Sequence, residues 1–185
     1  MNKIQIRRTV LTAAFTALIS AGAFVILPVG PVPIVLTTLF VVLSGLLGGF
    51  RIGVYSVVVY LILGILGLPV FAGGAGGFAV IAGPRGGYLM GYLLAAATSG
   101  LIFRSGNGNS GIANILLASF AALLAAASIY LPGLIWLQIT LGLEWGKVLN
   151  IGLLPFIPGD LLKTVAAVVL TVSLKDRFVS FLKDN

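Results

Sequence analysis

The sequence predicts an all-α membrane protein, a polytopic bundle of six transmembrane helices that forms a single transmembrane domain over residues 1–185. The chain is 59% hydrophobic and only 8% charged, whereas soluble domains are about 45–50% apolar and about 25% charged. Lipid offers backbone groups no hydrogen-bond partners, so a spanning chain must form helices or a closed barrel. The apolar runs lack the alternating pattern of barrel strands, which leaves helices.

Uncharged runs bounded by Pro, Gly or charged residues divide the chain into six spans. They are expected near residues 9–27, 34–50, 52–68, 86–103, 112–131 and 152–174. The first span follows basic residues, as a signal sequence does, but it exceeds the about 7–15 residues of a signal core and is expected to be retained. Two long connections, residues 69–85 and about 131–156, are the places where irregular backbone can line a cavity.

The basic residues predict the orientation, because positive charges in short loops stay on the cytoplasmic side. With the N-terminus inside, the cytoplasmic set is Lys3, Arg7, Arg8, Arg51, Arg104, Lys175, Arg177 and Lys183. Only Arg85 and Lys147 then lie outside. We therefore predict a multi-pass protein of the cell membrane with both termini in the cytoplasm. The formal charge of +7 is explained by topology and not by nucleic-acid binding.

The residues that catalysis needs are scarce. The chain has no Cys and no His, and two of its four acidic residues, Asp176 and Asp184, lie in the tail. An enzyme requires paired acids, a nucleophile with a base, or a metal cluster. We therefore expect no catalytic residues, no metal and no cofactor. No nucleotide-binding motif is present either, so any ATP hydrolysis has to occur on separate partner chains.

Two charged residues, Asp160 and Lys163, lie in the otherwise apolar sixth span. A charge near the bilayer centre costs about 2.5–3.5 kcal/mol on insertion scales, so such residues normally face a protein interior or a wet cavity. Their i, i+3 spacing places them on one helix face. Together they offer acceptors and a donor to one small polar group, such as a urea-like ring. The alternative is a self-neutralising ion pair that joins two helices.

Residues 69–88 are rich in glycine and are expected to be non-helical. Glycine lets the backbone approach a ligand closely and permits positive φ. Interleaved Phe71 and Phe78 suggest a segment that packs, while a flexible loop without function is the alternative. Arg85, at the outer mouth, is expected either to pair with a ligand carboxylate or to contact lipid headgroups. The candidate ligand-binding residues of this segment are Gly73, Gly74, Gly76, Gly77, Arg85 and Tyr88.

Small and aromatic residues give two weaker patterns. Ala13, Ala17 and Ala21 recur at i, i+4 spacing in the first span, which permits close helix contact within the bundle or against another protein. The aromatic residues Tyr130, Trp136 and Trp145 are expected in the belt at the membrane interface and not in a pocket.

Four short motifs follow one another along nearly the whole chain. They are Gly30-Pro31-Val32-Pro33-Ile34, Gly67-Leu68-Pro69-Val70-Phe71-Ala72-Gly73-Gly74, Gly83-Pro84 with Gly86-Gly87-Tyr88, and Leu154-Pro155-Phe156 with Pro158-Gly159-Asp160 and Lys163. In this order they resemble the BioY family, the biotin-binding S components of energy-coupling factor (ECF) transporters. The chain departs from many relatives at Val35 and Thr37, where polar residues are common, and at Arg85, often a small polar residue.

The resemblance implies a six-helix S-component fold that captures biotin with high affinity from outside. It implies delivery to an ATP-driven import complex, made of a transmembrane coupling protein and two cytoplasmic ATPases. It further implies that Asp160 and Lys163 bind the ureido ring and that Ala13 and Ala17 dock the coupling protein. Arg85 as the partner of the biotin carboxylate is our own inference. The alternatives are an S component for another small carboxylate or vitamin, and a non-catalytic structural membrane subunit.

Overall fold

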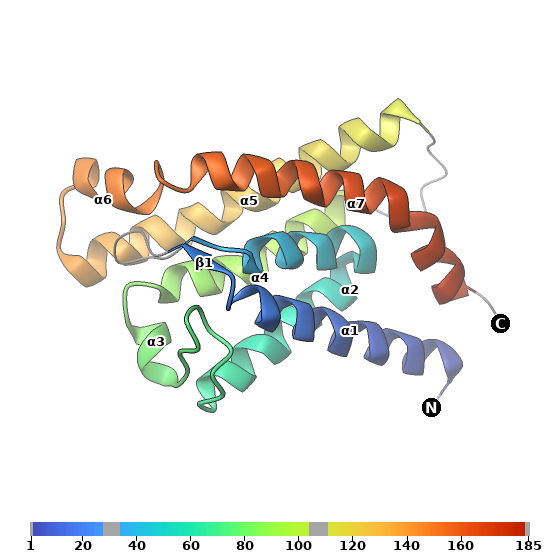
Figure 1. Ribbon diagram of the computed structural model, residues 1–185, viewed down its shortest axis with the longest axis horizontal. Helices are drawn as coiled ribbons and strands as arrows, with labels where there is room; N and C mark the ends of the chain where they lie inside the picture. The colour runs from blue at the N-terminus through green and yellow to red at the C-terminus, as the bar shows by residue number, and fades with distance from the viewer. Residues whose placement is uncertain (1, 28–33, 104–110, 184–185) are drawn as a thin grey trace.

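A computed structural model of the chain describes residues 2–27, 34–103 and 111–183 (Figure 1). The first of the four motifs therefore lies outside the described residues except for Ile34. The described part is a helical bundle with one short antiparallel pair of strands. In chain order the elements are α1 (Lys3–Gly22), β1 (Ile26–Leu27), β2 (Ile34–Val35), α2 (Thr37–Ile65), α3 (Phe78–Ala82), α4 (Gly86–Ile102), α5 (Ile112–Leu141), α6 (Trp145–Gly152) and α7 (Ile157–Lys183).

Helix α2 is a hairpin of two helices, because the chain reverses direction at Gly49 (Figure 1). Gly49 has φ of 71° and ψ of −178°, a conformation that favours glycine. A Cβ atom on Gly53 would lie 2.8 Å from the Cα atom of Gly45, whereas eight residues of straight helix span about 12 Å. The two halves therefore cross in direct contact. This reversal confirms the predicted break between the second and third spans.

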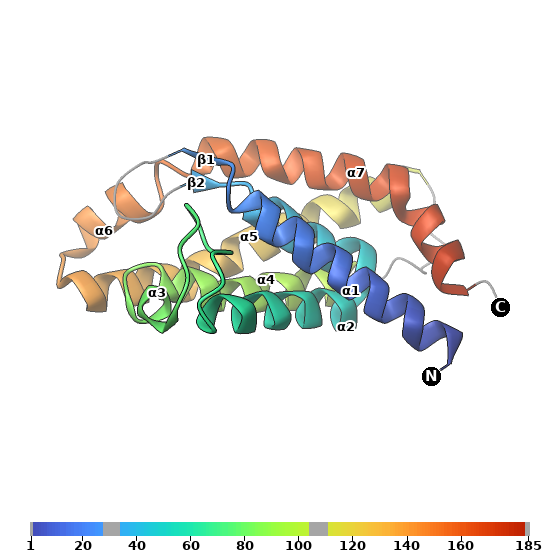
Figure 2. The same ribbon diagram turned by 60° about the horizontal axis from the view of Figure 1, so that its bottom comes forward.

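Three helices are long and apolar enough to cross a membrane among the described residues: α2, α5 and α7 over Ile157–Leu182. Helix α4 is apolar but shorter. Since α2 doubles back, the six predicted spans correspond in order to α1, the two halves of α2, α4, α5 and α7. The first turn of α1 and the last turns of α7 lie at the same end of the bundle (Figure 2), as an even number of spans requires.

Helix α4 lies between α2 and α5, and its contact with α5 is made largely by small residues. Small side chains let membrane helices approach closely, which increases van der Waals contact between them. The fully buried alanines of α4 and α5 are Ala95, Ala96, Ala118, Ala121, Ala122 and Ala125. Large apolar side chains such as Leu116 and Phe120 are instead exposed on the outside of the bundle, which suits a lipid environment.

Two predicted connections are more helical than expected. Helix α5 continues through Pro132 to Leu141, and α6 occupies much of the segment expected to be a connection. Membrane helices tolerate proline where neighbouring groups satisfy the freed backbone. The glycine-rich segment also contains α3, so its predicted non-helical character is wrong there, whereas α4 begins at Gly86, where the fourth span is predicted. A Cβ atom on Gly87 would lie 2.3 Å from the Pro132 carbonyl oxygen, so close packing outweighs the low helix propensity of glycine.

The ends of the first and last spans also differ from prediction. Helix α1 ends at Gly22 and is followed by β1. Gly22 packs closely on the start of α2, where a Cβ atom on it would lie 2.9 Å from the Thr37 nitrogen. Helix α7 begins at Ile157 and continues to Lys183, well beyond the predicted residue 174. The strands β1 and β2 lie beside the start of α7 (Figure 2).

The glycines of the loop between α2 and α3 allow the loop to adopt its folded conformation. Gly73, Gly74 and Gly77 have positive φ, a region that side chains rarely adopt. Their N–H groups donate within the protein, that of Gly77 to the Gly64 carbonyl at 2.7 Å and that of Gly73 to the Ala23 carbonyl at 3.2 Å. The loop is therefore a hydrogen-bonded structure that connects α2 to the end of α1.

Phe71 anchors this loop in the core. Its side chain is 1% exposed and packs edge-on against Tyr60, with ring centroids 5.4 Å apart. Gly64 faces the ring so closely that a Cβ atom there would lie 2.0 Å from it. Phe78, which we also expected to pack, is 68% exposed. One aromatic side chain, and not two, holds the loop against α2.

We predict that Phe71→Ala lowers the free energy of unfolding by about 3–5 kcal/mol, because it leaves a cavity where a buried ring packs. Amides of residues 72–77 should then exchange faster with deuterium. Phe78→Ala is the matched control and should leave both thermal stability and loop exchange nearly unchanged. Unaltered exchange of residues 72–77 in Phe71→Ala would show that the loop is held by its hydrogen bonds alone.

Candidate functional site

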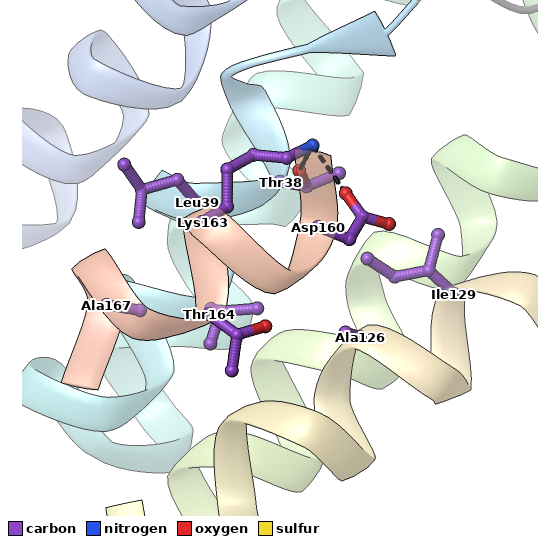
Figure 3. Close-up of a pocket in the computed structure, with 9 residues that line it drawn as sticks. Thr38, Leu39, Ala126, Ile129, Asp160, Lys163, Thr164 and Ala167 are labelled. Carbon is purple, nitrogen blue, oxygen red and sulfur yellow. Dashed lines mark hydrogen bonds and ion pairs between the residues drawn. The ribbon is translucent and has the colours of Figure 1, made fainter. Parts of the chain in front are cut away.

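An ion pair between Asp160 and Lys163 lies in the first two turns of α7 (Figure 3). The Lys163 Nζ and Asp160 Oδ1 atoms are 2.5 Å apart, and the side chains are 12% and 18% exposed, respectively. The two charges share one helix face, as their spacing predicts. Since both side chains point into the bundle, the pair is shielded from lipid and available to a cavity.

Three further groups complete this polar cluster. Lys163 Nζ donates to the Thr38 hydroxyl at 2.7 Å and to the Val35 carbonyl at 3.1 Å. The Tyr130 hydroxyl of α5 donates a short hydrogen bond to Asp160 Oδ2. All three ammonium protons of Lys163 are therefore used, whereas each Asp160 oxygen retains a lone pair for another donor.

Tyr130 and Thr38 are site residues that sequence reasoning missed. Tyr130 was expected in the interfacial belt, and this expectation is wrong because its hydroxyl is bonded to Asp160 inside the bundle. The contacts join residues 30 and 125 positions apart in the chain, so no local spacing indicates them. The only available signal was that a buried acid requires donors from some neighbouring helix.

A small cavity adjoins the ion pair between α2, α5 and α7 (Figure 3). Its volume is about 10 Å³, which is room for about one water molecule. Apolar side chains form most of the wall, and the polar groups converge on one side. The lining residues are Thr38, Leu39, Val42, Ala126, Ile129, Asp160, Lys163, Thr164 and Ala167.

A second cavity, of about 30 Å³, is lined by four aromatic residues among others and is bordered by the glycine-rich segment. Its lining residues are Val35, Thr37, Tyr60, Phe71, Ala72, Val80, Arg85, Tyr88, Leu89 and Tyr92. The Tyr88 ring packs edge-on against Tyr130, with centroids 6.3 Å apart. Tyr88 lines this second cavity, and Tyr130 donates to Asp160 at the first, so the tyrosine pair connects the two sites.

The Thr37 hydroxyl is buried at the wall of the second cavity without a hydrogen-bond partner in the described part of the chain. Thr37 is only 1% exposed. An unsatisfied buried polar group costs about 1–3 kcal/mol, and native proteins contain few of them. This hydroxyl therefore marks a position at which a polar ligand group would gain a hydrogen bond.

Arg85 and Tyr88 line the second cavity in different ways. The Arg85 guanidinium donates to the Ala72 carbonyl at 3.1 Å, which leaves most of its five N–H groups for another acceptor. No carboxylate of the described residues forms an ion pair with Arg85. The Tyr88 hydroxyl instead donates to the Gly152 carbonyl at 2.8 Å and holds the end of α6. Tyr88 thus offers its ring to the cavity and not its hydroxyl.

The remaining candidates lie farther from the cavities. None of Gly73, Gly74, Gly76 and Gly77 lines either cavity, so their direct contact with a ligand stays a prediction. Trp136 donates its ring N–H to the Gly83 carbonyl at 2.9 Å and thereby fixes the turn that precedes Arg85. No cluster of three or more metal-ligating side chains occurs within the described ranges.

The alanine stripe faces away from the bundle. Ala13, Ala17 and Ala21 are all exposed on α1, whereas Phe15, Thr16 and Ile19 of the same helix are buried. The stripe therefore does not mediate packing within the bundle. It is a surface of small residues that lipid or another protein can contact.

Comparison with known proteins places this architecture in a family. The model of the BioY family matches residues 1–180. The probable biotin transporter BioY of Pyrococcus horikoshii is 39% identical over 165 residues, which cover 89% of this chain and 94% of that protein. The biotin transporter BioY of Thermotoga maritima is 37% identical over 169 residues, covering 91% and 96%.

The fold agrees with these sequence relationships. A crystal structure of the S-component for biotin from an ECF-type ABC transporter superimposes with a TM-score of 0.86. That chain is 30% identical in sequence, and the match covers 95% of this chain and 94% of the other. These relatives are named as transporters or transporter components, which agrees with the expectation that the chain is not an enzyme. The chain belongs to the BioY family.

Proposed function

We propose that this chain captures biotin and delivers it to an ATP-driven ECF import complex. The observation that carries the proposal is the shielded Asp160–Lys163 pair, whose remaining lone pairs face a cavity inside a membrane bundle. The family membership and the relatives named as biotin transporters support the choice of ligand. A purely structural ion pair explains neither the adjoining cavities nor the unpartnered Thr37 hydroxyl.

The ureido ring of biotin suits the polar cluster. Its two N–H groups are donors, and the Asp160 carboxylate, which lines the first cavity, supplies acceptors. The ureido carbonyl requires a donor, but all three protons of Lys163 are already used. Lys163 must therefore exchange one partner when biotin binds. The longest of its three contacts, to the Val35 carbonyl at 3.1 Å, is the one we expect it to release.

The second cavity suits the rest of biotin. Aromatic rings of Tyr60, Phe71 and Tyr92 provide an apolar wall for the thiophane ring and aliphatic chain. Arg85 at this wall has free N–H groups for the carboxylate. The two cavities together are far smaller than biotin, so binding requires side chains to move. We expect Tyr88, which lines the second cavity, and Tyr130, which is bonded to Asp160, to move apart.

We predict that Asp160→Asn and Lys163→Ala each weaken biotin binding to the purified protein by about 10- to 100-fold. Hydrogen bonds to charged groups contribute about 1.5–3 kcal/mol, and about 1.4 kcal/mol corresponds to a tenfold change in affinity. Calorimetry on the detergent-purified protein measures this. Asp176→Asn, an exposed acid on the same helix, is the control and should bind normally. If Asp160→Leu/Lys163→Leu still binds biotin, the ion pair only joins helices and does not bind the ligand.

Arg85→Gln should remove the preference for a carboxylate. The parent protein is expected to bind biotin more tightly than biotin amide, because only the acid forms a charge-assisted pair with Arg85. In the variant the two ligands should bind about equally, while the ureido contacts remain. Lys147→Gln, which alters a basic residue that lines neither cavity, should keep the parent preference. A preference unchanged in Arg85→Gln would assign the carboxylate to another residue.

We further propose that Ala13 and Ala17 contact a transmembrane coupling protein, which links the chain to two cytoplasmic ATPases. The exposure of the stripe on α1 supports this assignment.

Both termini are proposed to be cytoplasmic, with the ligand site near the outer face, because the basic residues gather at the end of the bundle formed by the start of α1 and the end of α7. External labelling of a cysteine at Gly146, but not at Asp176, tests the orientation.

If the stripe docks the coupling protein, a change in the stripe should abolish biotin uptake without affecting biotin binding. Ala17→Leu should abolish copurification with the coupling protein and biotin uptake by cells, because added bulk prevents close helix contact. Biotin binding by the isolated variant should be unchanged. Ala14→Leu is the matched control, since Ala14 is also exposed on α1 but lies off the stripe. Equal loss of uptake in both variants would argue against a docking role for the stripe.

A further inference from the structure

An open groove runs between α1 and the second half of α2, at the end of the bundle where α1 begins. Its volume is about 470 Å³. The lining residues are Gln5, Arg8, Thr9, Thr12, Arg51, Ile52, Tyr55 and Val59. A second hollow, of about 390 Å³, shares Arg8, Arg51 and Ile52 with the groove and extends below the turn at Gly49. Both hollows are far larger than the cavities beside Asp160.

Two arginines from different helices converge on this groove. Arg8 and Arg51 line both hollows, and no acidic residue lines either. Within the described ranges neither guanidinium forms a hydrogen bond or an ion pair, and both residues are exposed. The neighbouring Arg7 differs, because it donates to the Phe181 carbonyl at 2.8 Å and lies over the Phe181 ring. Arg7 thus makes contacts within the protein, whereas the guanidinium groups of Arg8 and Arg51 are available to an acceptor on another molecule.

One end of the groove is basic and polar, and the other end is mostly apolar. Its basic end also carries the hydroxyl and amide groups of Thr9, Thr12 and Gln5. From Arg51 the groove continues along α2 to Tyr55 and Val59, which are 60% and 38% exposed. At 1.5 Å per residue, the distance from Arg51 to Val59 is about 12 Å along the helix axis. A charged end followed by an apolar wall matches a phospholipid headgroup followed by its acyl chain.

We propose that this groove binds one anionic phospholipid, with its phosphate between Arg8 and Arg51 and an acyl chain along Tyr55 and Val59. Guanidinium groups suit phosphate because their planar N–H forks bind two oxygens at once. Anionic lipid is concentrated on the side of the membrane to which basic residues are retained. The proposed site is separate from the biotin cavities and does not depend on the identity of that ligand.

Native mass spectrometry of the full chain tests the proposal, with phosphatidylglycerol or phosphatidylcholine titrated into the detergent-purified protein. The parent should retain one phosphatidylglycerol in preference to phosphatidylcholine. The variant Arg8→Gln/Arg51→Gln should lose this affinity by about tenfold or more. Lys3→Gln/Arg177→Gln removes the same charge at the same end of the bundle and should keep it. Biotin binding by each variant checks its folding.

Several results would overturn the proposal. An equal loss of phosphatidylglycerol affinity in Lys3→Gln/Arg177→Gln would indicate attraction by net charge. Equal retention of phosphatidylcholine by the parent would exclude a site specific for anionic lipid. Displacement of the lipid by millimolar inorganic phosphate would assign the arginines to a free anion. If lipid binding persists in Arg8→Gln/Arg51→Gln while copurification with the coupling protein is lost, the groove binds a protein instead. Arg8→Lys/Arg51→Lys, which keeps the charge, should bind the lipid with intermediate affinity even if the double Gln variant misfolds.

Discussion

The ion pair between Asp160 and Lys163 is the constraint that the rest of the site depends on. Charges are costly in lipid, so both side chains must turn inward and find partners from neighbouring elements. Lys163 does so through Val35 of β2 and Thr38 of α2, and Asp160 does so through Tyr130 of α5. One pair of charges thereby joins α7, α2 and α5 at the place where the ligand is proposed to bind.

The reversal of α2 makes this arrangement possible within a short chain. Because the chain turns at Gly49 and crosses itself at Gly45 and Gly53, both ends of α2 lie at the same end of the bundle. The first end supplies Thr37 and Thr38, and the second leads into the loop anchored by Phe71. The opposite end carries the turn at Gly49, with the basic groove beside it. The proposed biotin site and the proposed lipid site therefore lie at opposite ends of the bundle.

Composition and the cost of buried charge predicted the six spans, the break within α2 and the inward placement of Asp160 and Lys163 on one helix face. Sequence reasoning failed where contacts between distant segments decide the outcome. Tyr130 is not in the expected interfacial belt because its hydroxyl donates to Asp160, and α3 forms within the segment expected to be non-helical. The glycine-rich loop was expected to present its backbone to a ligand, yet its N–H groups at Gly73 and Gly77 are bonded to α1 and α2. Neither the hydrophobic periodicity nor the residue spacing of the sequence indicates such contacts.

A structure of the protein determined with bound biotin is the most direct test of this account. We predict that the ureido N–H groups contact Asp160, that the Tyr88–Tyr130 pair has separated, and that the carboxylate lies on Arg85. The ligand would then extend through both cavities, and Lys163 would have exchanged its contact with the Val35 carbonyl. Biotin bound elsewhere, with the contacts among Asp160, Lys163 and Tyr130 unchanged, would contradict the claim that this ion pair is the centre of the binding site.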